Sequence, residues 1–197
     1  VRADDGSDVS WREHIAAGAQ LAALLHTRLD PGKPPHVGVL LGNTPLFSAL
    51  LVAAGLGGAV PVGLNPTRRG AALARDIAHA DCQLVLTDSD PLSYGADFAP
   101  AGTDVLDVRS PTWSEELAGF WDAPVRFRAS AIEDLFMLIF TSGTSGDPKA
   151  VRCTHEKVAG PGVMLADRFG LGPKDTCYLS MPLFHSCLLY TSPSPRD

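Results

Sequence analysis

The sequence predicts an α/β domain in which helices cover both faces of a mainly parallel sheet. Two observations support this fold class. Several short runs, such as Val37–Leu41 and Leu84–Thr87, are apolar along their whole length, which is typical of strands buried on both faces. These runs alternate with longer segments of helical periodicity, as parallel sheets with crossover helices do. No repeat or linker divides the chain, so we expect one continuous unit.

The first helix begins at a capping box, Ser10–Glu13, in which the serine and the glutamate each satisfy a free main-chain donor. Pro31-Gly32 ends it, and the strand Val37–Leu41 follows. We expect the apolar face of this helix to comprise Trp11, Ile15, Ala19, Ala22, Leu25 and Leu29. The next elements, in order, are helix Thr44–Leu56, strand Ala59–Val62, helix Arg69–Ala80 and strand Leu84–Thr87.

The pattern between Ser89 and Ser130 is weaker, with an outer strand at Asp104–Val108 and a short helix at Trp113–Phe120. An apolar strand, Leu135–Phe140, then leads into a polar loop. The sequence predicts three elements after the loop: a strand at Ala150–Cys153, a helix from Thr154 to about Phe169 that is interrupted near Gly160-Pro161-Gly162, and a strand at Cys177–Ser180.

Composition excludes several classes of protein. With 45% hydrophobic and 19% charged residues, the 197-residue chain is globular rather than disordered. Its net charge of −6 argues against nucleic-acid binding, which usually needs a basic face. The four cysteines form no metal-binding pattern, so we expect reduced thiols, no metal site and a cytoplasmic protein; they are Cys82, Cys153, Cys177 and Cys187.

The stretch Pro45–Leu64 carries no charge and could suggest a membrane span. It is better divided into a buried helix and a buried strand, because Gly57-Gly58 interrupts it. The chain begins at Val1 without a methionine or a signal-like leader, so we expect the native N-terminus to lie further upstream.

The most informative segment is the loop Thr141–Lys149, which reads T-S-G-T-S-G-D-P-K. Glycines let main-chain N–H groups approach a ligand, and hydroxyls add further donors. The lysine adds a mobile positive charge, worth roughly 4 kcal/mol at ~4 Å from a phosphate oxygen and an effective dielectric of about 20. The loop is therefore predicted to bind a polyphosphate, although a plain polar hairpin turn is the alternative.

This loop is not a Walker A loop, which ends in G-K-[ST] and opens directly into a helix. Here Pro148 removes a donor, and Ala150 follows Lys149 where a magnesium-binding hydroxyl would stand. The expected arrangement is strand, loop, strand. The nearby pair Glu133-Asp134 does not suggest paired-carboxylate catalysis, since adjacent residues entering a strand point to opposite faces.

From Phe140 to His155 the sequence resembles the signature of the adenylate-forming superfamily of acyl-CoA synthetases, luciferases and adenylation domains, [YF]-T-S-G-[ST]-[ST]-G-x-P-K-[GA]-V followed by [ST]-H. Two further segments resemble the same family: Asn43–Phe47 with Ala54–Pro66, and Pro182–His185. The resemblance runs from Ser10 to Ser186 and is nearest to bacterial fatty-acid–CoA ligases. It implies the N-terminal part of the family's core domain.

The resemblance implies a role for each loop residue. Lys149 would be catalytic, holding the β- and γ-phosphates of ATP as pyrophosphate leaves. The other nucleotide-binding residues would be Thr141, Ser142, Gly143, Thr144, Ser145 and Gly146. His185 would lie at the mouth of the acyl pocket and contact the substrate, although a packed or surface histidine remains the alternative. His155 is expected to be structural, and no residue is assigned to a metal.

The implied reaction is ATP-dependent activation of a carboxylic acid to an acyl-adenylate and then to an acyl-CoA. The expected acid is a fatty acid. ATP, Mg²⁺ and coenzyme A are the implied cofactors. The resemblance leaves open a carrier protein as acyl acceptor and a peripheral membrane contact. Two rivals remain: a fatty-acid–AMP ligase that serves a carrier protein, and a non-catalytic nucleotide-binding module.

The last eleven residues, Cys187–Asp197, depart from the family pattern and resemble a translated sequencing adapter. A natural Pro/Ser-rich tail is the alternative. We therefore expect residues 1–186 to form a partial N-terminal AMP-binding domain, followed by a non-native tail. The family's contacts to adenine, ribose and magnesium would fall beyond Ser186, so the chain alone is expected to lack ligase activity.

Overall fold

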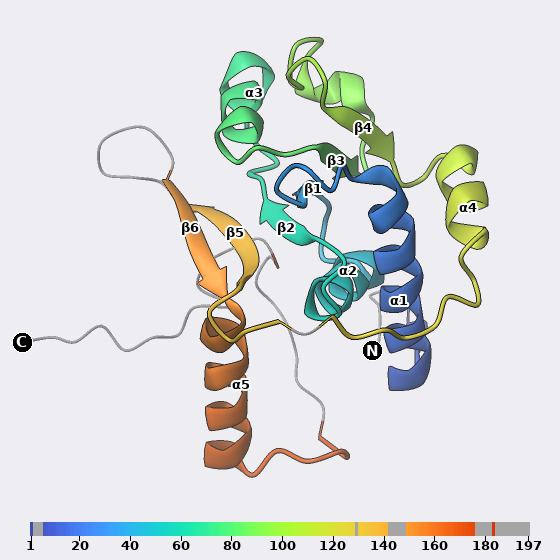
Figure 1. Cartoon of the computed structure of the whole chain (residues 1–197), viewed down its shortest axis with the longest axis vertical. Coiled ribbons are helices and arrows are strands. Elements are labelled where there is room, and N and C mark those ends of the chain that lie inside the picture. The colour runs from blue at the N-terminus through green and yellow to red at the C-terminus, as the bar shows by residue number, and fades with distance from the viewer. Residues whose placement is uncertain (2–5, 129, 142–148, 176–182, 184–197) are drawn as a thin grey trace, which may run out of the picture.

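A six-stranded sheet forms the centre of the molecule (Figure 1). The computed structural model describes residues 1, 6–128, 130–141, 149–175 and 183, and of Thr141 only the main chain. The strand order is β4-β3-β1-β2-β5-β6. The five strands β1–β5 run parallel, and β6 pairs antiparallel with β5. Their bounds are β1 His36–Leu40, β2 Val60–Gly63, β3 Leu84–Thr87, β4 Asp104–Asp107, β5 Leu135–Thr141 and β6 Lys149–Thr154.

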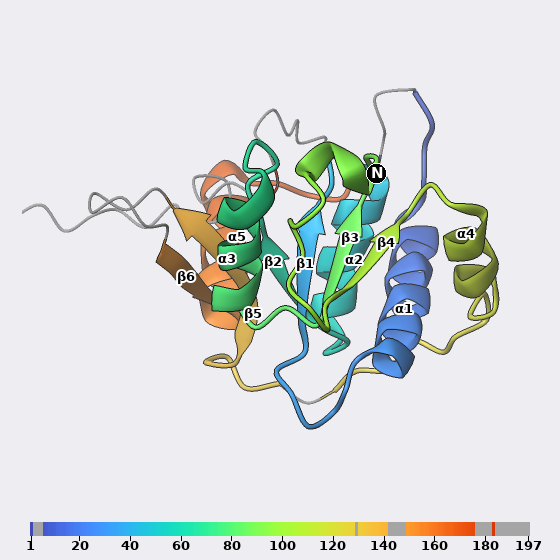
Figure 2. The same cartoon turned by 90° about the horizontal axis from the view of Figure 1, so that it is seen from above.

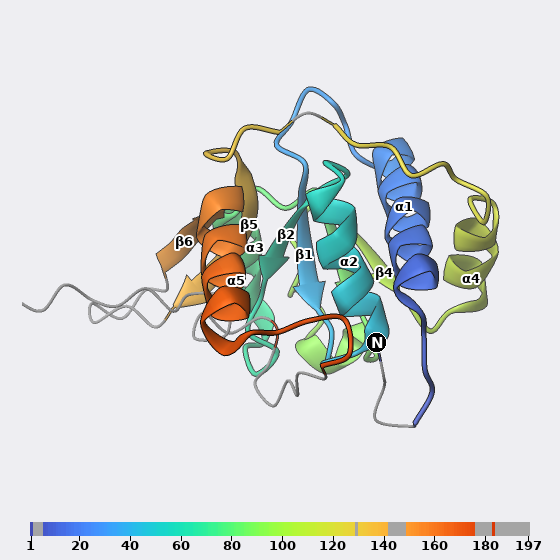
Figure 3. The same ribbon diagram turned by 90° about the horizontal axis from the view of Figure 1, so that it is seen from below.

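Helices lie on both faces of this sheet (Figures 2 and 3). One face carries α1 (Trp11–Arg28), α2 (Pro45–Gly55) and α5 (His155–Phe169), and the other carries α3 (Gly70–His79). The short helix α4 (Pro111–Ala118) packs beside α1 near β4. The fold class and the order of these elements are as predicted. The sequence did not predict the 3₁₀ helix η1 (Pro91–Tyr94), and the strand expected at Cys177–Ser180 lies outside the described residues.

Two apolar layers hold the helices to the sheet. On the α1/α2 face, Leu25, Phe47 and Leu86 are fully buried in one cluster. On the α3 face, Leu73 and Ile77 belong to a second cluster. Because strands β1 and β3 contribute alternate residues to the two clusters, both faces of the parallel sheet are apolar, which explains the unbroken apolar runs in the sequence.

Both predicted helix caps are present. The Ser10 hydroxyl accepts a hydrogen bond from the main-chain N–H of Glu13, and the Glu13 carboxylate accepts one from the N–H of Ser10. Thr154 caps α5 by accepting from the N–H of Lys157 at 3.3 Å. These side chains satisfy donors that a helix leaves free in its first turn.

The predicted apolar face of α1 is wrong at its N-terminal end. Trp11 and Ile15 are exposed, at 69% and 38%, whereas His14 and Gly18 are buried. The helix is rotated because Gly18 allows close contact with α2: a Cβ on Gly18 would lie 2.4 Å from a methyl of Val52. Here a small residue, and not the bulky apolar ones, marks the packing face.

The expected interruption of α5 is also wrong, because the helix continues through Pro161. A proline removes one main-chain hydrogen bond, and its neighbours Gly160 and Gly162 have no side chains to crowd the ring. The helix has no buried residue. Its large exposed apolar side chains, here called the α5 apolar face, are Val163, Met164, Leu165 and Phe169. Within the described residues, no helix is long and apolar enough to cross a membrane.

Candidate nucleotide-binding site

The carboxyl ends of the parallel strands lie at one edge of the sheet, here called the carboxyl edge. Strand β2 pairs in parallel with β5, with Val62 opposite Leu138 and Gly63 opposite Ile139. The loop that follows β5 therefore leaves the sheet at the same edge as the segments that follow β1 and β2. Ligands of open α/β sheets bind at this edge, so the predicted phosphate loop begins in the expected place.

The two arms of the loop are joined by the sheet itself. Thr141, the last residue of β5, pairs directly with Lys149, the first residue of β6. The strands thus reach one residue further into the predicted loop at each end than the sequence indicated. Residues 142–148, which include Ser142, Gly143, Thr144, Ser145 and Gly146, lie outside the described residues. Strand pairing at both arms holds the ends of this seven-residue segment at a fixed separation.

Lys149 is exposed at this edge. On the opposite arm, the ring of Phe140 packs 6.2 Å from the ring of His79 in α3, and Phe140 borders the apolar cluster beneath that helix. One arm is therefore fixed to the core, whereas the lysine ammonium is free to reach a ligand. A lysine in this setting acts as a mobile point charge on a flexible stem.

A second segment joins the same edge through one long-range hydrogen bond. The main-chain N–H of Leu183 donates to Oδ1 of Asn43, at 2.8 Å, and Asn43 lies just after β1. Leu183 itself is buried in the cluster under α2. Leu183 and Asn43 belong to two different segments that carry the family resemblance, and their contact could not be predicted from either segment. His185, two residues further on, lies outside the described residues.

Side-chain contacts hold the segment after β2 in place at the carboxyl edge. Asn65 Oδ1 accepts from both the N–H and the hydroxyl of Thr67, at 2.9 and 2.8 Å. Arg68 forms an ion pair with Asp76 of α3 at 2.7 Å, and Asp76 is almost fully buried. The guanidinium of Arg69 lies 4.8 Å from the centre of the Tyr94 ring. These contacts fix the turn that borders the carboxyl edge.

Other candidate groups have structural roles or face solvent. The ring of His155 packs edge-on against Phe136 at 5.3 Å, as expected for a structural histidine. Glu133 and Asp134 are exposed and precede β5. Burial raises the pKa of the Cys82 thiol to about 12, with a further contribution from Asp81. Burial also raises the pKa of the Cys153 thiol. Both cysteines are free and buried, and neither is activated for nucleophilic chemistry.

Comparison with known proteins now decides the family. A family model described as AMP-binding enzyme matches residues 1–192. The chain belongs to the AMP-binding enzyme family.

Relatives of this AMP-binding chain include medium/long-chain-fatty-acid–CoA ligase FadD17 of Mycobacterium tuberculosis. The two are 62% identical over 182 residues, which cover 92% of this chain and 35% of the relative. Steroid-22-oyl-CoA synthetase of Rhodococcus jostii is 39% identical over 181 residues, covering 90% of this chain and 32% of that protein. The chain therefore spans about a third of the length of these curated relatives.

Solved structures of the family confirm the fold. ATP-bound MatB from Rhodopseudomonas palustris matches with a TM-score of 0.78 over 94% of this chain and 38% of that one, at 23% identity. At this identity the likeness establishes the arrangement of the AMP-binding chain's strands and helices.

Proposed function

We propose that this chain is the N-terminal part of a ligase that uses ATP to activate a carboxylic acid, first to an acyl-adenylate and then to an acyl-CoA. The observation that carries the proposal is the Thr141–Lys149 strand pair at the carboxyl edge, which holds both arms of the signature loop. The FadD17 and steroid-22-oyl relatives support it, because both are named for forming CoA thioesters.

In this proposal Lys149 stabilises negative charge as pyrophosphate leaves. Its side chain is exposed, and its main chain pairs with Thr141, so the residues on either side of the loop are held together. This donor set fits a polyphosphate, because glycine-rich main chain, hydroxyls and an ammonium all donate and none carries negative charge. The one acidic loop residue, Asp147, has no role in this proposal.

The acid would approach from the same edge. Leu183 is fixed to Asn43 by its main-chain hydrogen bond, so the segment that resembles the acyl-pocket element starts from a defined point beside β1. We propose that His185, two residues beyond this anchor, contacts the carboxylic acid. The relatives' substrates range from fatty acids to a steroid acid, so we propose a bulky, largely apolar acid.

Coenzyme A as acceptor follows from the relatives' names, and Mg²⁺ would accompany ATP as the resemblance implies. We assign no residue of this chain to either. Two variants belong to the same proposal. The acyl group could pass to the thiol of a carrier protein instead of that of coenzyme A, and the enzyme could contact a membrane surface, because a fatty acid partitions into lipid.

The test is pyrophosphate exchange into ATP by the complete protein expressed from its genomic locus. Medium-chain, long-chain and steroid side-chain acids would each be supplied, and thioester formation would then be followed with coenzyme A. We expect acid-dependent exchange followed by CoA-dependent thioester formation. Exchange that is absent with every acid would contradict the proposal, and exchange without CoA-thioester would favour the carrier-protein acceptor.

A further inference from the structure

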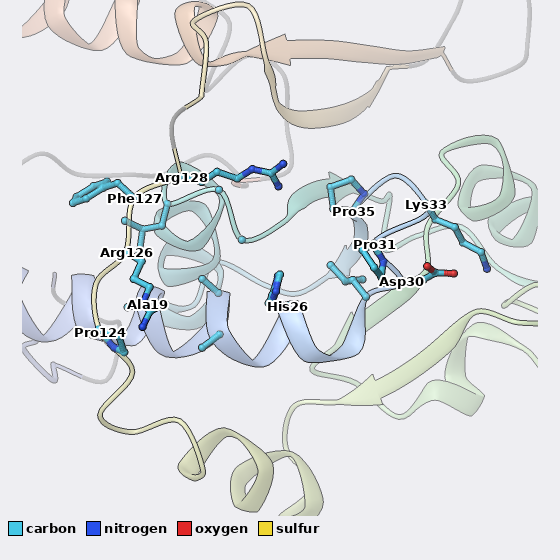
Figure 4. Close-up of a pocket in the computed structure, with 16 residues that line it drawn as sticks. Ala19, His26, Asp30, Pro31, Lys33, Pro35, Pro124, Arg126, Phe127 and Arg128 are labelled. Atoms are coloured by element: carbon cyan, nitrogen blue, oxygen red, sulfur yellow. The ribbon is translucent and has the colours of Figure 1, made fainter.

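A second candidate site lies at the opposite edge of the sheet, far along the strands from the phosphate loop. It is a groove of about 900 Å³ between α1, the segment leading into β1, Gly57-Gly58 before β2, and an extended strap formed by Pro124–Arg128 (Figure 4). We call it the amino-edge groove. Pro35 precedes β1 and Gly58 precedes β2, so both lie where the parallel strands begin.

The floor of the groove is apolar and built from close contacts. Ala19, Ala22 and Ala23 of α1 contribute small side chains to it. A Cβ on Gly58 would lie 2.6 Å from the Cβ of Ala22, so α1 rests directly on this glycine. Leu29 and Leu56 extend the same surface. The floor is therefore lined by apolar side chains and able to contact an apolar group.

The strap that forms one wall is fixed at its end. The N–H of Arg128 donates to the carbonyl of Leu56 at 3.2 Å. Gly57 has a φ of +83°, and a Cβ there would lie 2.6 Å from the Cβ of Arg128. The main chain of the strap therefore sits against a glycine in the left-handed region, which favours glycine over other residues. This contact sets the position of Arg128 relative to α1.

The rim of the groove is positively charged. His26 projects from α1, Arg126 points toward α1, and Arg128 points toward Pro35 (Figure 4). Lys33 is a fourth basic lining residue. Within the described part of the chain, no ion pair or side-chain hydrogen bond is recorded for these four side chains.

Among the described residues that line the groove, Asp30 alone is acidic, and its Oδ1 accepts a hydrogen bond from the N–H of Gly32 at 2.8 Å. A protein with a net charge of −6 thus places one lysine and two arginines, Lys33, Arg126 and Arg128, around one groove. Guanidinium groups bind phosphate through two parallel hydrogen bonds, and the alanine floor suits an apolar substituent.

We propose that the amino-edge groove binds a phosphate ester that carries an apolar group. The exposed side chains of Arg126 and Arg128, two residues apart on the strap, would turn from the directions seen in Figure 4 to meet the phosphate, and the α1 alanines would lie under the apolar part. Phe127, exposed at 79% on the same strap, points out of the groove and adds apolar surface at its mouth. Such a ligand could be a free amphiphile or the headgroup of a membrane lipid. The proposal concerns the free amphiphile, because the groove and not a flat surface provides the contacts.

The test is calorimetric titration of the 197-residue chain with a short-chain phosphatidic acid below its micelle concentration. Arg126→Gln and Arg128→Gln would each weaken binding by roughly tenfold or more, since each removes a charge-assisted pair. Arg126→Lys would restore part of the loss. Arg75→Gln is the matched control, because Arg75 is an exposed arginine on α3, on the other face of the sheet. Thermal unfolding of each variant would establish that it is folded.

Two further ligands distinguish the sources. We expect inorganic phosphate to bind at least roughly tenfold more weakly than the short-chain lipid, because it makes no contact with the apolar floor. Equal affinity for the two would overturn the proposal. So would an equal loss in Arg75→Gln, an absence of binding, or binding confined to phosphatidic-acid vesicles, which would indicate a membrane-docking surface instead.

Discussion

Replacing Asn43 with alanine should release the segment around Leu183 from the carboxyl edge. The substitution removes the oxygen that accepts the Leu183 N–H at 2.8 Å. The donor belongs to a buried residue, but Asn43 is exposed, so water can partly replace the lost acceptor. A net hydrogen bond of about 1–1.5 kcal/mol is therefore the appropriate magnitude.

That energy corresponds to a roughly 5- to 12-fold loss of local protection, at a factor of ten for each ~1.4 kcal/mol. The assay is amide hydrogen exchange resolved at Leu183. Asn65→Ala is the matched control, because Asn65 follows the neighbouring strand β2 but bonds only within its own turn in the described structure. Unchanged exchange at Leu183 in Asn43→Ala, or the same increase in Asn65→Ala, would refute the reasoning.

Three further predictions concern stability and solubility. Gly58→Ala should lower the unfolding free energy by roughly 1–3 kcal/mol in denaturant melts, because the new Cβ meets Ala22, whereas Gly55→Ala, in open space at the end of α2, should be neutral or stabilising. Burial, followed by the charge of the amino terminus, lowers the pKa of His14, so its contribution to stability should be lost as pH falls below about 6.5; His14→Gln should flatten the pH dependence of urea unfolding there, and an unchanged slope would contradict this. The α5 apolar face should bind a hydrophobic dye, and charged substitutions on it should reduce both dye binding and aggregation without lowering the melting temperature.

The order of strands and helices could be predicted because each element carries its own local signal. Strand β3 is apolar on both faces, and α1 begins with a capping box that forms as expected. The rotation of α1 could not be predicted in this way, since Gly18 is required by its close contact with Val52, which lies on another helix. The apolar pattern of a helix shows which residues can be buried, but the helix that packs against it determines which face is buried.

The candidate site also has features that the sequence could predict and features that it could not. The loop chemistry and Lys149 follow from a contiguous run of residues, so sequence alone could propose them. The Asn43–Leu183 contact joins residues 140 positions apart, and no periodicity encodes it. The amino-edge groove is likewise formed by α1 and a strap about a hundred residues further along the chain. Gly57 is needed there because Arg128 of the strap packs against it, which the sequence around Gly57 does not show.

The central claim is that the Thr141–Lys149 loop grips the phosphates of ATP during acid activation. Pyrophosphate exchange by the complete enzyme carrying Lys149→Ala tests it most directly, with Lys174→Ala, an exposed lysine in the segment after α5, as the control. We expect the Lys149 variant to lose roughly 10²–10³ in exchange rate, the usual cost of one preorganised charge-stabilising group, while the control keeps its rate. An unchanged rate in Lys149→Ala would contradict the account.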